Sequence, residues 1–535
     1  MVNIIKARDD TRQGIFRIAN TVSLELSIQY SVTILSPSVW HETPDSTMFN
    51  NHQEALPPDT SGSDVKGEYN TSAHLEYVPA SQLGQANFLD AESPANPQTW
   101  PVWKKNAQIL MVAFHSMVAT FMAAGIIPAY DAMAEAYGVT VPQASYLTSM
   151  QILLLGICPL FWKPLTAVYG RYHIFMLSAL GSMVCNIGGA RCTTYGAQMA
   201  TRVLTAIFIS PPMGVGSGII TELCEPEQRA QKLGWWTLML TLGTPGGPFI
   251  MGFVTHHLGY QWMYWIFAIM NLVQLLAYLI LGEETLYLPA PEPPSPSLNT
   301  TNPPRFYHKL RPRRINPHPL TLQAFFTPLL FLRRPRVLIP ALTHAIVFCY
   351  ANIALIVEMP IVFGERFAFN SQQIGLQFIA IIIGCLLGEQ LSGPLSDKLL
   401  RAHGTHRPAD RLWLAYIAFG TVVTGLLVWG FQLSKATTWN VTPCVGAAIA
   451  SFGNQALTTI MVSYAVDSHR EVATDVGVCI NVVRHVYGFI GPFYFPPMFE
   501  TLGLAGAAGV MCAIVGGCAL PAVVGLHIVD VRGGR

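Results

Sequence analysis

Long apolar runs, separated by short polar segments, make up most of the chain after residue 107. The runs occupy residues 107–129, 144–162, 172–190, 196–221, 233–254, 259–282, 337–357, 371–388, 412–434, 441–466, 476–499 and 502–529. Each run is long enough to cross the hydrocarbon core of a bilayer, roughly 30 Å thick, as one α-helix. The pattern therefore predicts an all-α membrane protein with twelve transmembrane helices.

The runs fall into two groups of six, separated by a polar stretch that is rich first in Pro and then in Arg. Lys163-Pro-Leu-Thr-Ala167 follows the second run, and Gly393-Pro-Leu-Ser-Asp397 follows the eighth at the same relative position. Parallel six-helix repeats are a known transporter architecture. We therefore expect six-helix bundles at 101–284 and 337–530, joined by a cytoplasmic central loop at 285–336.

The loops on one side of the predicted membrane carry most of the Lys and Arg, whereas those on the other side hold only Arg191, Arg366 and Lys435. Because cytoplasmic loops retain an excess of these residues, we expect both termini to be cytoplasmic, in a plasma-membrane protein. Residues 1–100 lack a sustained hydrophobic period and predict a disordered N-terminal tail. Residues 531–535 form the predicted C-terminal tail.

The composition agrees with a membrane protein and excludes several other classes. Hydrophobic residues make up 51% of the chain and charged residues 11%, against about 25% charged in soluble domains. The net charge of +1 gives no sign of nucleic-acid binding. No phosphate-binding loop, nucleophile elbow or metal-ligand pair occurs, so we expect no enzyme and no cofactor. We expect a monomer that binds a small-molecule substrate and protons within a lipid bilayer, with an ion gradient as its energy source.

Few ionisable residues fall within the apolar runs, and each costs at least about 2.5 to 3.5 kcal/mol there. The proton-coupling candidates are Arg202 in the fourth run, Glu358 at the end of the seventh and Glu389 at the end of the eighth. Arg484 lies within the eleventh run. A structural or snorkelling arginine is the other interpretation of Arg202. Interfacial carboxylates are the other interpretation of the two glutamates.

The fifth run carries a pattern of small residues: Gly234, Gly243, Gly247-Pro248 and Gly252. Small residues let helix backbones approach closely, and ordinary helix packing would explain them. The spacing also resembles the antiporter motif of the drug and proton antiporter group in the major facilitator superfamily, apart from Met251, which stands where a second Gly is usual. This resemblance implies two six-helix bundles and proton-coupled export.

Further motifs agree with this resemblance. Gly393 and Asp397 look like part of a loop motif that locks one conformation, and Gly170 and Arg171 belong to its first-half copy. Lys163 and Ala167 stand where Gly and Asp are usual, which counts against a lock in the first half. Arg202 matches a fourth-helix arginine associated in the family with proton coupling. Motifs such as Ile374-Gly-Leu-Gln-Phe378, Tyr464-Ala-Val-Asp467 and Gly491-Pro-Phe-Tyr-Phe495 are similar to a fungal, twelve-span branch.

The resemblance implies a secondary transporter that exports drugs or secondary metabolites by alternating access. The candidate pocket residues are Phe121, Tyr146, Trp236, Phe348, Tyr350, Asn454 and Tyr487, although core packing would explain most of them equally well. Two other hypotheses stay open. One is proton-coupled uptake or exchange of an organic cation such as a polyamine, and the other is a nutrient sensor that transports nothing. A channel has the least support, since no ring of charges is visible.

Overall fold

The computed structural model describes residues 97–224, 226–286, 314–316, 320–402, 408–469 and 472–533. All of them belong to one compact unit, Val78–Arg535. Over these ranges the regular elements are all helical. Almost all of the predicted tail 1–100, and most of the predicted central loop 285–336, lie outside the described residues.

The first half of the described chain runs from α3 to α11. Its elements, in order, are α3 (Val102–Gly125), η2 (Ile127–Ala129), α4 (Tyr130–Tyr137), α5 (Val141–Ile157), α6 (Pro159–Tyr169), α7 (Arg171–Gly189), α8 (Tyr195–Ile209), α9 (Pro211–Leu223), α10 (Pro226–Leu258) and α11 (Gln261–Leu281). Helices α5 and α6 meet at a bend of 42°.

The second half follows two short elements, α13 (Leu322–Leu330) and η3 (Phe331–Arg333). Its elements are α14 (Pro335–Phe348), the π-helical turn η4 (Cys349–Ile353), α15 (Ala354–Val357), α16 (Met359–Phe367), α17 (Ser371–Ala402), η5 (Pro408–Arg411), α18 (Leu412–Lys435), α19 (Thr442–Ser468), α20 (Ala473–Ile514), the π-helical turn η7 (Val515–Ala519) and α21 (Leu520–Gly533).

Nine helical stretches among the described residues are long and apolar enough to cross a membrane, or ten if the bent pair α5 and α6 is one span. One of the nine, Ala473–Arg532, is 60 residues long and is broken at Gly503, which has a φ of 69°. A break there leaves two membrane-spanning lengths. Together with the 19-residue α7, these stretches are consistent with the predicted twelve helices.

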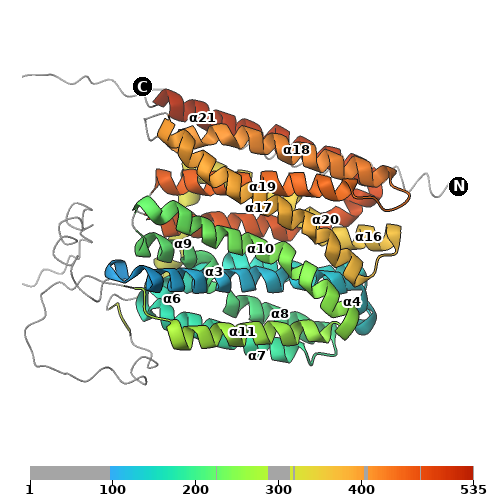
Figure 1. The fold of residues 1–535 in the computed structure, drawn as a ribbon, viewed down its shortest axis with the longest axis horizontal. Helices are drawn as coiled ribbons and strands as arrows, with labels where there is room; N and C mark the ends of the chain where they lie inside the picture. The colour runs from blue at the N-terminus through green and yellow to red at the C-terminus, as the bar shows by residue number, and fades with distance from the viewer. Residues whose placement is uncertain are drawn as a thin grey trace, which may run out of the picture. The chain divides into compact units, whose positions relative to one another are not determined.

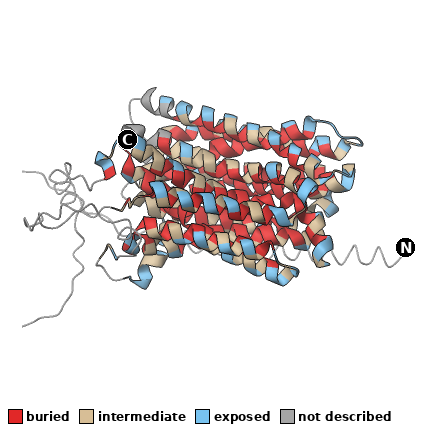
Figure 2. Cartoon of the chain, turned by 60° about the horizontal axis from the view of Figure 1, so that its bottom comes forward, coloured by how far each residue is buried: buried red, intermediate tan, exposed pale blue. Residues whose placement is uncertain are grey.

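The long helices lie side by side, with their ends at two opposite faces (Figure 1). We call the face carrying Lys104, Lys163, Arg171 and Arg411 the basic end; it is on the left in Figure 1. The opposite end carries α4 and α16. Buried residues fill the middle of the bundle, and exposed residues lie mainly on outer faces and at helix ends (Figure 2).

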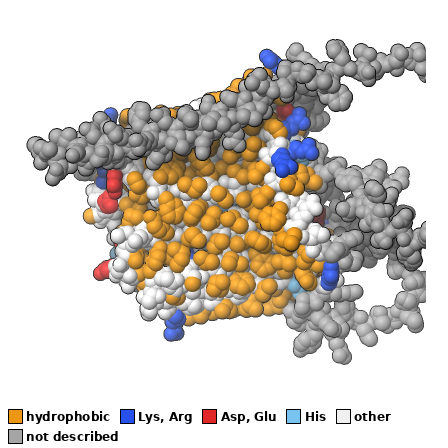
Figure 3. All heavy atoms as spheres, turned by 180° about the vertical axis from the view of Figure 1, so that it is seen from behind, with side chains coloured by type: hydrophobic (Ala, Val, Ile, Leu, Met, Phe, Trp, Pro, Cys, Tyr) orange, Lys and Arg blue, Asp and Glu red, His pale blue; other side chains and the backbone are white. Residues whose placement is uncertain are grey.

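The outer face of the bundle is strongly apolar. Hydrophobic side chains cover the middle of the face in Figure 3, and charged side chains lie near its margins. Large exposed residues include Leu180, Ile269, Leu276, Ile417 and Val510. A water-soluble protein rarely exposes so continuous an apolar surface, whereas helices that face lipid do.

The two halves pack against each other along two main seams, one between α10 and α17 and the other between α5 and α20. Helix α10 also packs closely on α3 within the first half. Each seam brings together residues more than a hundred positions apart. The space between the halves is therefore bordered by α3, α5 and α10 on one side and by α14 to α15, α19 and α20 on the other.

The segments predicted as loops after the second and eighth runs are helical. Lys163 to Ala167 lies within α6, and Gly393 to Asp397 lies within α17. The hydrophobic pattern ends where lipid contact ends, but each helix continues, because backbone hydrogen bonds do not depend on an apolar face. Both motifs are therefore held rigidly at the basic end.

Candidate functional site

A small cavity of about 40 Å³ lies at the centre of the bundle, between the two halves. Its apolar wall includes Ala123, Ile152, Leu155, Ile353 and Ile356. Its polar lining comes from both halves and includes Thr120, Thr148, Thr241, Asn352, Asn454, Gln455, Thr458, Arg484 and His485. A mostly apolar space with a few convergent polar groups is the usual form of a small-molecule site.

A second cavity, of about 70 Å³, continues from the central one toward the basic end. Leu240, Thr458 and Arg484 border both cavities. Trp236 also lines the second cavity, and its indole N–H donates to Ser116 Oγ at 2.8 Å. Either space is large enough for water molecules, but both are far smaller than the several hundred Å³ of a drug-sized pocket. The described form is therefore closed around its centre.

At the opposite end, aromatic and glycine contacts between the halves close the path to the cavity. Tyr146 of α5 stacks on Phe493 of α20, with ring centroids 4.6 Å apart. Gly252 of α10 meets the start of α17 so closely that an added Cβ would lie 2.6 Å from the Ser371 carbonyl oxygen. The two seams thus lack space for a substrate at this end.

At the basic end, an ion pair joins the halves. Lys163 on α6 donates to Asp475 in the first turn of α20. Deeper along the same seam, the Asn481 amide donates to the Leu155 carbonyl oxygen at 3.2 Å. The Lys163 and Asp475 side chains are 21% and 16% exposed, so the pair is only partly screened by water.

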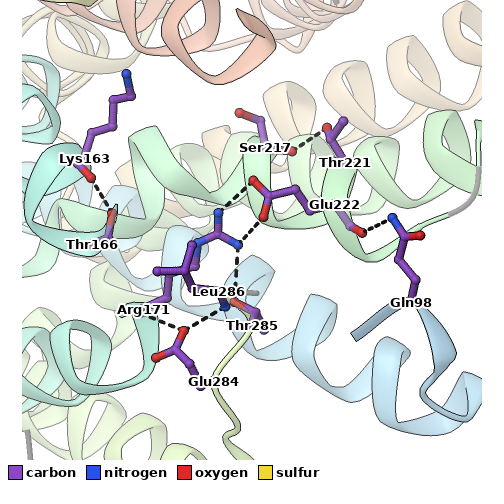
Figure 4. Close-up of polar contacts among 10 residues, drawn as sticks. All are labelled: Gln98, Lys163, Thr166, Arg171, Ser217, Thr221, Glu222, Glu284, Thr285 and Leu286. Carbon is purple, nitrogen blue, oxygen red and sulfur yellow. Dashed lines mark hydrogen bonds and ion pairs between the residues drawn. The ribbon is translucent and has the colours of Figure 1, made fainter. Parts of the chain in front are cut away.

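The predicted lock residues of the first half connect elements within that half (Figure 4). Arg171 binds Glu222, at the end of α9, at 2.8 Å. The Glu284 carboxylate accepts from the Arg171 backbone N–H at 3.0 Å. Gly170 precedes α7 with a φ of 86°, in the left-handed region that favours glycine. In the second-half copy, Gly393 lies on α17 with open space around it, and the Asp397 side chain lies outside the described residues.

The small residues of α10 allow close packing against two helices, α3 and α17. Added Cβ atoms at Gly243 and Gly247 would lie 2.4 Å and 2.5 Å from backbone oxygens of α3, and Gly252 meets α17 as described. An added Cβ at Gly234 would lie 3.4 Å from Glu389 Oε1, on α17. Pro248 lies inside α10. The small residues therefore bring α10 close to α3 within the first half and close to the candidate carboxylate Glu389 on α17.

Arg202 is only 1% exposed and binds the end of α3. Its Nη2 donates to the Met122 and Ala123 carbonyl oxygens, at 2.9 Å and 3.1 Å. These carbonyls belong to the last turn of α3, where the helix leaves such groups without an intrahelical partner. Arg202 Nε and Nη1 have no partner among the described residues. Arg202 therefore caps the break in the first span, beside the central cavity.

The two candidate glutamates lie in different surroundings. Glu389 accepts from Gln455 Nε2 at 2.6 Å and from Thr459 Oγ1 at 2.8 Å, and Gln455 also lines the central cavity. Glu358 lies at the junction of α15 and α16, is 1% exposed, and its Oε1 has no hydrogen-bond partner in the described part of the chain. Neither glutamate borders either cavity.

Of the predicted pocket residues, Phe348 and Asn454 line the central cavity and Trp236 lines the second. The others lie elsewhere: Phe121 packs on Phe267, Tyr146 is at the opposite end, and Tyr350 hydrogen-bonds Tyr487. The sequence indicated Arg484 as an ionisable residue in an apolar run and as a neighbour of the motif Gly491-Pro-Phe-Tyr-Phe495, but it did not indicate Gln455, Thr458 or His485. The charge of Arg484 inside an apolar run drew attention to it. Gln455, Thr458 and His485 carry no such signal in the sequence.

Comparison with known proteins adds a family assignment to this geometry. The sequence model of the Major Facilitator Superfamily matches residues 112–492. The chain is 26% identical over 462 residues to the efflux pump radE of Floropilus chiversii, covering 83% of this chain and 85% of radE. It is 27% identical over 471 residues to the efflux pump vrtL of Penicillium aethiopicum, covering 82% and 90%. The MFS-type transporter atr4 of Stereocaulon alpinum is 26% identical over 495 residues, covering 89% and 87%.

A solved structure has the same fold. The crystal structure of the human organic anion transporter MFSD10 (TETRAN) superposes with a TM-score of 0.54 at 16% identity. The match covers 79% of this chain and 99% of that one.

Proposed function

Because this chain belongs to the major facilitator superfamily, we propose that it is a proton-coupled exporter of small amphipathic molecules that works by alternating access. The observation that carries the proposal is the central cavity, which both halves line and which contacts between the halves close at either end. Rocking of the halves would open one end at a time around the same site. The positive-inside rule assigns the basic end to the cytoplasm.

In this proposal Glu389 carries the coupled proton. Gln455 lines the cavity and donates to Glu389, so it links the carboxyl group to the substrate site. Gln455 and Thr459 both donate to Oε2, so an incoming proton binds Oε1, neutralises the carboxylate and weakens the charge-assisted hydrogen bond from Gln455. This changes the hydrogen-bonding groups that Gln455 presents to the central cavity. Substrate and proton thereby favour different arrangements of the same side chains.

Glu358 and Arg202 have other parts in this proposal. Glu358 lies toward the opposite end, where it serves as the second proton site. Arg202 fixes the break of α3, from which Ala123, Ala124 and Ile127 face the cavity. The alternative of organic-cation uptake has less support, because neither glutamate borders a cavity in which an amine would bind.

The test uses inside-out proteoliposomes, in which the lumen corresponds to the cell exterior. We expect an acidic lumen to drive accumulation of at least one of two dyes, anionic carboxyfluorescein and cationic rhodamine 6G. Glu389→Gln should abolish this uphill accumulation while keeping dye exchange without a gradient. Glu500→Gln, which changes an exposed carboxylate on α20, is the matched control and should transport normally. Uphill transport by Glu389→Gln would contradict the coupling role, and indifference of both dyes to the gradient would contradict the function.

A further inference from the structure

Arg484 is a buried cation on the wall of both cavities. It lies on α20, at the part of the interface where the central cavity and the second cavity meet. Its side chain is more than nine-tenths buried, with 8% of the residue exposed, and its Nε has no hydrogen-bond partner in the described part of the chain. A charge in this position must be compensated by the protein, by water or by a ligand.

The groups that touch Arg484 are neutral. Its Nη2 donates to Asn481 Oδ1 at 3.0 Å and lies 3.4 Å from His485 Nε2. His485 Nδ1 lies 2.8 Å from the Asn481 carbonyl oxygen, which can only accept, so the imidazole proton is on Nδ1 and Nε2 is the acceptor. The guanidinium also lies over the Phe348 ring, 4.8 Å from its centroid. These contacts orient Arg484 without cancelling its charge.

The carboxylates of the described residues do not reach Arg484. No Asp or Glu of the described residues forms an ion pair with it, whereas other buried or half-buried cations such as Lys163 and Arg411 have such partners. Glu389 is engaged by Gln455 and Thr459 instead. The titratable groups that do face Arg484 are His485 on its own helix and His344 on α14, which borders the second cavity. The cavity therefore has a positive wall.

The other residues that line the central cavity indicate which further chemical groups a ligand would have. The amide oxygens of Asn352, Asn454 and Gln455 lack hydrogen-bond partners in the described part of the chain, and all three residues border the central cavity. Such oxygens accept from hydroxyl or N–H groups. The remaining wall is aliphatic, with Ile152, Leu155 and Ile356 among its residues. A hydrated inorganic anion would leave this wall unused.

From these contacts we propose that the substrate is an amphipathic organic anion, whose acidic group binds Arg484 and whose hydroxyl or amide groups meet the three amide oxygens. This rests on the proposed function, since it names the substrate class of the same site. The apolar body of the ligand lies against the aliphatic wall once the halves open enough to admit it. A carboxylate or a sulfonate provides the charge, because each presents two oxygens to the planar fork of the guanidinium.

Equilibrium dialysis with the purified full chain in detergent tests the proposal. The probes share one ring system and differ in charge: naphthalene-2-sulfonate, naphthalene-2-sulfonamide and 2-naphthyltrimethylammonium. We expect the anion to bind about tenfold or more tightly than either analogue, since a hydrogen bond to a charged group contributes at least that much. Arg484→Gln should remove the preference by lowering sulfonate affinity about tenfold or more. Arg191→Gln, at an exposed arginine of the opposite end, should bind like the wild type.

A second variant covers the case in which Arg484→Gln fails to fold. Asn481→Asp is isosteric and places a carboxylate at the atom that now accepts from Arg484. The internal carboxylate should compete with the ligand and lower sulfonate affinity about tenfold or more. Equal binding of the three probes, no measurable sulfonate binding, or a preference that survives Asn481→Asp would overturn the proposal. Dialysis needs no proton gradient, so its result tests the preference for an anion and does not test proton-coupled transport. The proteoliposome assay tests the coupled transport independently.

Discussion

The ion pair between Lys163 and Asp475 should hold the basic end closed. It joins α6 of the first half to the first turn of α20 in the second, and no other ion pair of the described residues crosses between the halves. We perturb it with Lys163→Gln and Asp475→Asn, singly and together. Asp475→Asn keeps the side-chain shape, Lys163→Gln keeps a polar side chain that is one bond shorter, and each change removes a charge.

The expected size of the effect follows from the burial of the pair. Fully exposed pairs contribute about 0.2 to 1 kcal/mol, and hydrogen bonds to charged groups about 1.5 to 3 kcal/mol. With side chains 21% and 16% exposed, this pair should lie between these limits, at about 1 to 2 kcal/mol. Each single variant should therefore raise the open population at the basic end about 5- to 30-fold. The double variant should do no more than either single one.

The assay measures how fast a membrane-impermeant maleimide alkylates a cysteine introduced at Ser217, which lines the second cavity. The parent chain with its ten native cysteines gives the background rate. Lys104→Gln is the matched control, because Lys104 pairs with Glu283 at the same end but within one half. Unchanged alkylation in both single variants, or strictly additive effects in the double variant, would refute the reasoning.

Three further predictions test the packing. Gly243→Ala places a Cβ 2.4 Å from the Met117 carbonyl oxygen within the first half. It should destabilise the fold by about 1 to 3 kcal/mol, which is measured as a lower Tm. An unchanged Tm would contradict the contact. Gly252→Ala places a Cβ 2.6 Å from the Ser371 carbonyl oxygen in the other half. It should therefore slow transport in proteoliposomes, with a smaller loss of Tm than Gly243→Ala causes. Normal transport by this variant would count against closure at the seam between α10 and α17. Arg171→Gln should lower the Tm by breaking contacts within one half, without changing alkylation at position 217.

The fold was predictable because a bilayer leaves so few options. Twelve apolar runs could hardly form anything but helices, and the repeated motif after the second and eighth runs indicated two halves. The partners of individual residues were not predictable in the same way. Lys163 stands where Gly is usual in the family, and we interpreted this as evidence against a lock. Its partner Asp475 is 312 positions away, and nothing in the local pattern connects the two.

Depth in the membrane could be estimated from position in a run, but the direction of a side chain could not. Arg202 and Arg484 both lie well inside their runs, and the sequence favoured Arg202 for function. The rotation of each helix gives the two arginines different surroundings: Arg484 faces the cavities, and Arg202 faces the end of α3. A single charged residue gives no periodicity from which to determine this rotation, because the surrounding run is apolar on all sides.

The first span of each half is broken at a similar depth, but among the described residues only the break in the first half is capped by an arginine. Helix α3 gives way to η2 just before Pro128, and α15 gives way to α16 just before Pro360. Each break frees carbonyl oxygens that lipid cannot satisfy, so a buried donor or a close packing partner is required. In the first half Arg202 supplies the donor. In the second half the break instead carries the buried Glu358, whose Oε1 has no hydrogen-bond donor among the described residues. The two halves thus share a broken first span but differ in the ionisable side chain at the break, which is an arginine in the first half and a glutamate in the second.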